Sequence, residues 1–299
     1  DVTLSIIKNC EDIPGFKQKV YYNEHVYRVS DRTERFCELM QTGCECIGDI
    51  DMYDIYEIIG LAAESLRLIS NDYVLEVSCL DLIEKWIFCA CGDEGFAEKA
   101  LRCIAEKNAH DLSRLCARYR VSRPDETRLL LLISAYGERN AVIAALAQEC
   151  APDDLTGLKA LSALLDRSPC GDKIRFDFSV VNNMGYYNGF VFRGFLSGVS
   201  DGVLSGGQYD RLMEKMHRQS KAIGFAIYLD ELEQLRGEDS RFDVDVLVRY
   251  DDSVRAEDVA AAVAANAALG RSVSAQKAAD SRLRYREAVD LRREDVKSC

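Results

Sequence analysis

The sequence predicts an α+β protein, with an antiparallel sheet and flanking helices, a helical insert, and a small C-terminal α/β domain. Three observations predict this. Two zones rich in β-branched and aromatic residues, 1–80 and 171–236, are separated by residues 81–170, which have a helical pattern. A strand–helix–strand pattern follows over residues 242–299. Because a sheet must bury one face against helices, we expect the two β-rich zones to form one core that the insert interrupts.

The first β-rich zone is predicted to contain two strands and a helix. Residues 19–29 and 41–47 carry β-branched and aromatic side chains, and the polar residues 30–35 between them predict a loop. Residues 51–69 place Ile, Ala and Leu at the spacing of one helical face.

The insert is predicted to hold four or five short helices, because Ala and Leu are dense and the pattern is broken at a few places. These breaks are at 91–93, 123–124, 136–137 and 151–152.

The second β-rich zone contains three predicted strands, at 174–181, 189–196 and 222–228. Gly206 and Gly207 predict a tight turn before a short helix at 209–216, and residues 229–235 predict another helix.

The C-terminal zone is predicted to be a β-α-β unit, after a linker at 236–241 that is rich in charge and Gly. Its expected elements are a strand at 243–250, a helix at 256–269 and a strand at 271–276.

The charge balance excludes broad classes of partner. With 38 Lys and Arg against 50 Asp and Glu, the formal net charge is −12. Binding to nucleic acid or to an anionic membrane needs concentrated positive charge, so we expect neither partner. No apolar run approaches the ~20 residues that span a bilayer, and the N-terminus has no signal-like segment. We therefore expect a cytoplasmic protein.

The twelve cysteines do not predict a metal or disulfide framework. Only three His are present, and none lies near another in the sequence. Segments such as 87–91 surround Cys with apolar residues. We interpret the cysteines as small buried hydrophobic residues in a reducing compartment, and we expect no metal and no cofactor.

Strand 41–47 carries the first candidate binding residues. Gln41 and Glu45 alternate along the strand, so both side chains project to one face. An amide beside a carboxylate suits an ammonium or imidazole ligand. The alternative is that these residues form the solvated face of an edge strand.

Tyr186 and Tyr187 are the second candidates, because they stand between Gly185 and Gly189. Glycines allow a ligand to approach closely, and phenol rings supply an apolar wall with a polar tip. A plain turn with packed aromatic residues fits equally well. The nearby SGGQYD at 205–210 lacks the Lys-Ser/Thr of a phosphate-binding loop and is a weak nucleotide motif.

Taken in order, several motifs resemble those of the histidyl-tRNA synthetases. The matching segments are DVT at 1–3, YR at 27–28, RF at 35–36, QTGCECIG at 41–48, GYYNGFVF at 185–192, SGGQYD at 205–210 and AIGFAI at 222–227. The resemblance covers about residues 1–235 and implies a class II synthetase core. It further implies histidine binding by Glu45 to the imidazole, by Gln41 to the α-amino group, and by Tyr186 and Tyr187. Asp1 and Thr3, at a strand end in that family, are weaker candidates.

The sequence departs from the synthetase pattern at the ATP site. Asn182 and Glu231 stand where the family has arginines that assist adenylate formation and contact ATP, which leaves Arg28 alone. Losing one preorganised donor typically slows such chemistry by about 10²–10³. We therefore interpret Arg28, Asn182 and Glu231 as a vestigial ATP site. The resemblance places motif 1, the dimerisation motif of the family, before residue 1 of the sequence.

A synthetase core that keeps the amino-acid site and loses the ATP arginines is similar to the regulatory subunits of ATP phosphoribosyltransferase. This resemblance implies a non-catalytic chain that activates the short-form catalytic subunit in a hetero-octamer. It also implies a homodimer through the synthetase-like core and feedback inhibition by L-histidine, in the first step of histidine biosynthesis. Histidine is expected either in the old synthetase site or at the contact with the catalytic subunit.

Two other functions are alternatives to a regulatory subunit. One is a histidine-activating enzyme, either a synthetase or a free-standing ligase, and the other is a tRNA-binding or stress-sensing paralogue.

Overall fold

The computed structural model describes residues 2–13, 15–29, 36–181, 186–235, 242–277 and 282–292. The chain divides into two compact units, Asp1–Glu233 and Gln234–Cys299, and each is described by itself. The predicted loop at 30–35 and the predicted linker at 236–241 lie outside the described residues.

The first unit is built on an eight-stranded sheet with the order β1-β2-β8-β7-β6-β3-β5-β4. Its pairs are antiparallel except for β3 and β5, which are parallel. The α+β class and the mainly antiparallel sheet are thus confirmed. The strands are β1 (Gln18–Val29), β2 (Phe36–Gly48), β3 (Tyr73–Cys79), β4 (Tyr136–Gly137), β5 (Ile174–Asp177), β6 (Asn188–Leu196), β7 (Leu204–Gln208) and β8 (Lys221–Tyr228).

Helices α1 (Val2–Asn9) and α2 (Met52–Ile69) flank this sheet. Helix α2 begins at a capping box, in which Asp51 and Asp54 each accept a hydrogen bond from the backbone N–H of the other. Its apolar stripe is fully buried against the strands, and Gly194 on β6 leaves the space that Leu66 fills. The periodicity of 51–69 therefore gave the helix and its buried face correctly.

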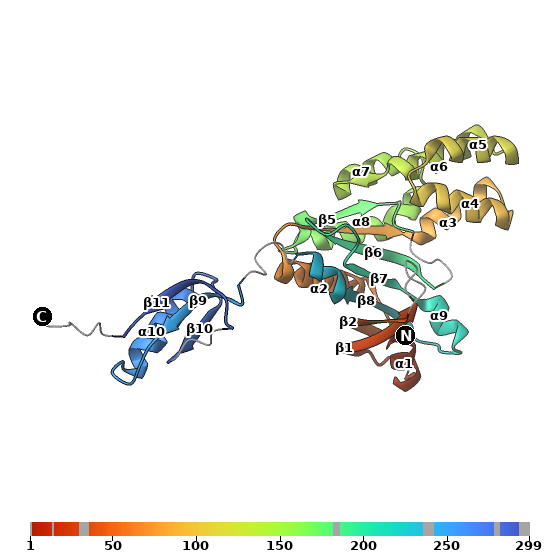
Figure 1. Ribbon diagram of the computed structural model, residues 1–299. Coiled ribbons are helices and arrows are strands. Elements are labelled where there is room, and N and C mark those ends of the chain that lie inside the picture. The colour runs from red at the N-terminus through yellow and green to blue at the C-terminus, as the bar shows by residue number, and fades with distance from the viewer. Residues whose placement is uncertain are drawn as a thin grey trace, which may run out of the picture. The chain divides into compact units, whose positions relative to one another are not determined.

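The stretch 81–170 contains six α-helices rather than four or five. They are α3 (Leu80–Ala90), α4 (Glu94–Ala105), α5 (Ala109–Tyr119), α6 (Arg123–Ser134), α7 (Arg139–Leu146) and α8 (Thr156–Leu165), with short 3-10 turns η1 (Pro152–Leu155) and η2 (Gly171–Lys173). The missed break separates α4 from α5, where Lys107 takes a positive φ of 52° and Asn108 caps α5. Neither residue is Gly or Pro. In Figure 1, α4–α7 gather on the side of β5, away from β1 and α1.

One prediction for the second β-rich zone is wrong, and one is confirmed as a 3-10 helix. Gly206 and Gly207 lie inside strand β7 and not in a turn. A Cβ at position 206 would stand 2.5 Å from the carbonyl oxygen of Gly224 and 2.6 Å from the ring of Phe192, so this strand needs glycine for close packing. The helix expected at 229–235 is the 3-10 helix η3 (Leu229–Leu235). A short α-helix, α9 (Asp210–Lys215), precedes β8.

The cysteines are less buried than the sequence predicts. Among those described, Cys46, Cys116 and Cys170 are buried, Cys89 is exposed, and the others are half-buried. The apolar residues around 87–91 therefore did not predict burial of the cysteines among them, because a helix turns successive side chains to different faces.

The second unit has a parallel sheet of order β10-β9-β11 with one helix. Its elements are β9 (Val244–Arg249), α10 (Ala256–Ala267), β10 (Val273–Gln276) and β11 (Tyr285–Asp290), and the last strand was not predicted. Val246, Leu247 and Val248 of the central strand form its buried core. In the part of the chain that the structure describes, no helix is long and apolar enough to cross a membrane.

Candidate functional site

Glu45 is the centre of the candidate site. It lies in β2 and is 2% exposed. The hydroxyl of Thr3 donates to its Oε1 at 2.9 Å, and the hydroxyl of Tyr209 donates to its Oε2 at 2.7 Å. Strand β2, helix α1 and the residue before helix α9 thus converge on one carboxylate.

Burial dominates the electrostatics of Glu45. It raises the pKa of this carboxyl to about 7, although the hydrogen bonds from Tyr209 and Thr3 oppose the shift. The side chain therefore changes charge near neutral pH, and a ligand that donates hydrogen bonds or carries positive charge would stabilise the ionised form.

Gln41 lies four residues earlier on the same strand face and is also 2% exposed. Its Nε2 has no hydrogen-bond partner among the described residues. A buried donor without a partner carries a free-energy penalty, which a ligand acceptor would remove. The alternative, that Gln41 and Glu45 form the solvated face of an edge strand, is wrong, because β2 is an inner strand between β1 and β8.

Glycines on neighbouring strands leave room around the carboxylate. In the register of the sheet, Glu45 is opposite Gly224, which is opposite Gly207. A Cβ at position 224 would stand 1.7 Å from Oε2 of Glu45, and one at position 207 would stand 3.0 Å from the ring of Tyr187. No side chain larger than hydrogen fits at position 224 unless Glu45 moves.

Three tyrosines form an aromatic wall beside Glu45. The rings of Tyr186 and Tyr187 meet edge to face at 4.6 Å, and those of Tyr186 and Tyr209 lie 5.8 Å apart. Burial raises the pKa of the Tyr187 hydroxyl, and the nearby tyrosines and Glu45 raise it further. The Tyr187 hydroxyl is therefore a neutral hydrogen-bonding group at physiological pH. We call Thr3, Gln41, Glu45, Tyr186, Tyr187 and Tyr209 the Glu45 cluster.

A hollow adjoins the Glu45 cluster between helix α1 and strand β1. It is lined by Val2, Ser5, Ile6, Val20, Tyr22, Glu24, His25, Val26 and Tyr27. Val20, Tyr22 and Glu24 are opposite Glu45, Gly43 and Gln41 in the sheet register, so this hollow continues the same face of the sheet.

The predicted site residues have different outcomes. Of the candidates for histidine, Gln41, Glu45, Tyr186, Tyr187 and Thr3 are brought to one region, whereas Asp1 lies outside the described residues. Thr3 is in the first turn of helix α1 and not at a strand end, so the prediction of its backbone was wrong.

Tyr209 was not predicted as a site residue. This residue belongs to the SGGQYD segment at 205–210 and lies 164 residues from Glu45 in the sequence. In the sequence, Tyr209 is marked only by the glycine pair that precedes it, and this pattern does not indicate that its partner is Glu45.

The predicted ATP-site residues are only partly described. Asn182 and the side chain of Arg28 lie outside the described part of the chain, and the backbone of Arg28 pairs with Cys37. Glu231 is half-buried in η3. This segment is attached to β2, because the backbone N–H of Met40 donates to Asp230 at 2.9 Å. Glu231 thus lies on the segment that directly follows Tyr228, the residue opposite Gln41.

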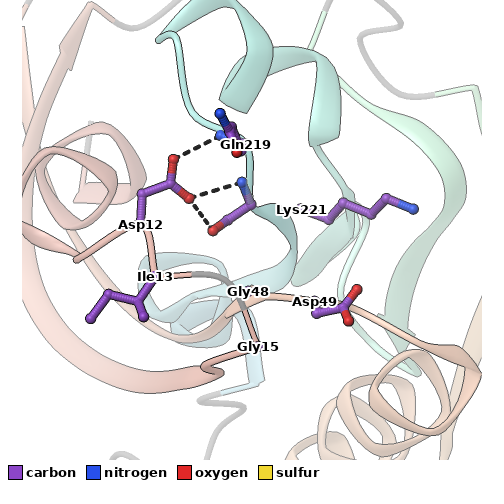
Figure 2. Close-up of a pocket in the computed structure, with 8 residues that line it drawn as sticks. Asp12, Ile13, Gly15, Gly48, Asp49, Gln219 and Lys221 are labelled. Atoms are coloured by element: carbon purple, nitrogen blue, oxygen red, sulfur yellow. Dashed lines mark hydrogen bonds between the residues drawn. The ribbon is translucent and has the colours of Figure 1, made fainter.

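A second hollow lies at the other end of β2, where none of the predicted residues is found (Figure 2). The carboxylate of Asp12 accepts hydrogen bonds from the backbone N–H groups of Gln219 and Ser220, at 2.8 and 2.9 Å. The hydroxyl of Ser220 also donates to this carboxylate. That bond, together with the two backbone bonds, lowers the pKa of Asp12 and attaches the segment after α1 to the start of β8. Within the described ranges, no three His, Cys, Asp or Glu side chains lie close enough together to hold a metal ion.

Solved structures identify the fold of the chain. An ATP phosphoribosyltransferase regulatory subunit/histidyl-tRNA synthetase from Bacillus halodurans gives a TM-score of 0.68 at 24% identity, over 97% of this chain and 76% of that one. Histidyl-tRNA synthetase from Nostoc sp. PCC 7120 gives 0.63 at 13% identity, over 94% and 69%. A chain of the ATP phosphoribosyl transferase (HisG:HisZ) complex from Thermotoga maritima gives 0.60 at 20%, over 76% and 78%. The fold is that of the class II aminoacyl-tRNA synthetases.

Within this class, the chain belongs to the histidyl-tRNA synthetase family, which it matches over residues 3–232. It is 31% identical over 224 residues to an ATP phosphoribosyltransferase regulatory subunit of Bacillus pumilus, and 28% identical over 230 residues to that of Halalkalibacterium halodurans. These alignments cover 73% and 75% of this chain but 57% and 58% of the relatives. The chain thus spans less than two thirds of the length of these relatives.

Proposed function

We propose that the chain is a non-catalytic regulatory subunit of ATP phosphoribosyltransferase, and that it binds L-histidine at the Glu45 cluster. The observation that carries the proposal is the pairing of a buried carboxylate and a buried, partnerless amide donor on one strand face, at Glu45 and Gln41. The relatives named above carry the regulatory-subunit name over the same part of the chain.

The chemistry of the Glu45 cluster fits an amino acid with an imidazole ring. The carboxylate of Glu45 accepts the imidazole N–H, and the tyrosine rings pack against the ring faces. The oxygen of Gln41 accepts from the α-ammonium group, while its Nε2 donates to the α-carboxylate. Histidine therefore satisfies both buried groups at once, whereas an aliphatic amino acid leaves Glu45 without a partner for its charge.

Glu231 supports the loss of adenylation chemistry. Attack at the α-phosphate develops negative charge, which cations stabilise and a carboxylate opposes. Glu231 occupies the position at which the motif resemblance places an arginine, on the segment next to β2. Histidine binding without ATP chemistry is what a sensor subunit needs.

In the proposed assembly the chain joins the short-form catalytic subunit in a hetero-octamer, activates it and transmits histidine inhibition. Such regulation requires that histidine bind two states of the assembly with different affinities. The second candidate is a histidine-activating enzyme, which the match to the histidyl-tRNA synthetase family favours.

Two measurements together test the proposal. ATP–pyrophosphate exchange is measured with and without L-histidine, and the chain is mixed with the short-form catalytic subunit for co-purification and transferase assays. We expect no histidine-dependent exchange, co-purification, and higher transferase activity that L-histidine then inhibits. Histidine-dependent exchange would instead establish the activating enzyme, and failure to associate would refute the regulatory role.

A further inference from the structure

The residues after the tyrosine pair are each held by a side chain from another part of the molecule. Asn188 and Asp210 bind each other reciprocally: Asn188 Nδ2 donates to Asp210 Oδ2 at 3.1 Å, and the Asp210 backbone N–H donates to Asn188 Oδ1 at 2.7 Å. The other oxygen of Asp210 accepts from the backbone N–H of Ala222 at 3.0 Å. Because Asp210 follows Tyr209, this carboxylate links both tyrosine segments to β8.

The next residue, Gly189, is held from the helical stretch. Its backbone N–H donates to Oδ1 of Asp81, in the first turn of α3, at 3.0 Å, across 108 positions of sequence. Gly189 has a φ of +55°, in the left-handed region that favours glycine. The backbone N–H of Phe190 in turn donates to Oε1 of Gln208 at 2.8 Å. Three consecutive residues are thus held, Asn188 by its side chain and Gly189 and Phe190 by their backbone N–H groups, and Gly189 is held by helix α3.

Helix α3 has a second connection to the same region. Both terminal nitrogens of the Arg211 guanidinium, in α9, donate to the carboxylate of Glu84, one turn after Asp81. Paired hydrogen bonds of this kind fix orientation as well as distance. Helix α3 therefore holds the strand that follows Tyr187 through Asp81, and the helix that follows Tyr209 through Glu84.

We propose that Asp81 and Glu84 are positioning residues of the histidine site, acting from α3 on the two segments that carry its tyrosine wall. The inference rests on the proposed function for its ligand. Neither residue needs to touch histidine. A change in helix α3 displaces the tyrosines, and by reciprocity histidine binding restrains helix α3. The stretch 81–170 thereby becomes responsive to the occupancy of a site to which it contributes no ligand group.

The test compares three substitutions in helix α3. Asp81→Ala removes the acceptor for Gly189, whereas Asp81→Asn keeps an oxygen that can accept the same hydrogen bond. Lys85→Ala is the matched control. Lys85 forms an ion pair with Asp154 at 2.6 Å, so this substitution removes a contact of the same helix that does not involve the tyrosine segments. Calorimetry gives the dissociation constant for L-histidine, and hydrogen exchange reports on the peptide that covers residues 186–192.

We expect Asp81→Ala to weaken histidine binding about tenfold and to speed exchange in that peptide, while Asp81→Asn and Lys85→Ala stay within about threefold of the unmodified chain. Where Asp81→Ala does not fold, Glu84→Gln serves instead, with an expected loss of about threefold to fivefold. Equal affinity and equal exchange in Asp81→Ala and Lys85→Ala would overturn the positioning role.

The design separates failure of this inference from failure of the proposed function. If the unmodified chain does not bind L-histidine, the proposed histidine site is refuted. Exchange in 186–192 without ligand then decides the positioning role alone. Faster exchange in Asp81→Ala than in Asp81→Asn supports it, and identical exchange refutes it.

Discussion

Strand β2 and the 3-10 helix η3 present two carboxylates in opposite settings. Glu45 on β2 is almost fully buried and receives a hydroxyl hydrogen bond on each oxygen. Glu231 on η3 is half-buried, in a segment that Asp230 attaches to β2. Burying the Glu45 carboxylate in the core costs free energy. Such a group is expected only where it binds a ligand or has strong structural partners. The second places negative charge at the position where the motif resemblance expects an arginine.

Under the proposed function, this difference means that amino-acid binding and adenylation chemistry depend on separate residues in this fold. An amino-acid site needs shape, buried hydrogen-bond partners and a tuned carboxylate, and strand β2 supplies these with help from Thr3 and Tyr209. Adenylation needs cations around a phosphate, which is a different set of residues on other segments. One set can be lost while the other stays, and the following predictions test that separation.

Glu45→Ala should have the largest effect. It removes the group that the proposed function assigns to the imidazole, together with the acceptor of the hydrogen bonds from Thr3 and Tyr209, so we expect at least a hundredfold loss of L-histidine affinity by calorimetry. Glu45→Gln is the control for shape, since it keeps the size and an acceptor oxygen and loses only the charge. Unchanged histidine binding in both variants would place the ligand elsewhere, for instance at the contact with the catalytic subunit.

The pH dependence of stability should follow from the raised pKa of Glu45. The folded value of about 7 lies above the ordinary value of 4.5, so protonated Glu45 is favoured in the folded state. Protonation of Glu45 contributes about 3 kcal/mol to the free energy of unfolding. This contribution is fully present below about pH 4.5 and is lost as the pH rises to about 7. Urea unfolding of Glu45→Gln and of the unmodified chain should therefore show a gap that widens from pH 5 to pH 8 in favour of the variant. A gap independent of pH would contradict the burial of an ionisable group at this position.

Gly224→Ala should destabilise the chain by about 2 kcal/mol, because its Cβ would stand 1.7 Å from Oε2 of Glu45 and must push the carboxylate aside. Gly60→Ala is the matched control: it lies within helix α2, and its Cβ would meet nothing within 4 Å. There we expect a gain of up to about 1 kcal/mol, because alanine favours helix. Thermal and urea unfolding measure both. Equal effects at the two positions would mean that the space around Glu45 is not tightly filled.

The sequence predicted the local elements well, because alternation and helical spacing are properties of neighbouring residues. Both strands of the β1–β2 pair, helix α2 and the central strands of the second zone were found in this way. Gln41 and Glu45 on one face follow from the two-residue period of a strand. Their burial does not follow, because it depends on β8, which lies about 180 positions later and covers β2 on its second edge.

The failures have the same physical origin. Gly206 and Gly207 have the local preference of a turn, yet the sheet uses them to let Phe192 and Tyr187 approach the strand. The contacts of Thr3 and Tyr209 with Glu45 join positions 42 and 164 residues apart, and no local pattern specifies such pairs. What a residue touches across the sheet is decided by strand order and register, which local periodicity leaves open.

Tyr209→Phe should have the smallest effect. It sharpens the comparison between Glu45 and Glu231, because it removes one hydrogen bond to Glu45 and leaves the Glu45 side chain itself unchanged. The hydroxyl of Tyr209 lowers the pKa of Glu45 against the effect of burial, so its loss raises that pKa further. At pH 7 fewer molecules then carry the ionised carboxylate, and we expect L-histidine affinity to fall about tenfold. At pH 8 the loss should shrink, because ionisation recovers in the variant. Tyr119→Phe, which removes a hydroxyl from a ring packed edge-on against Phe96 in the helical stretch, should leave the affinity unchanged at both values. A loss in Tyr209→Phe that is the same at pH 7 and pH 8 would show that the hydroxyl acts on the ligand directly, and not through the charge of Glu45.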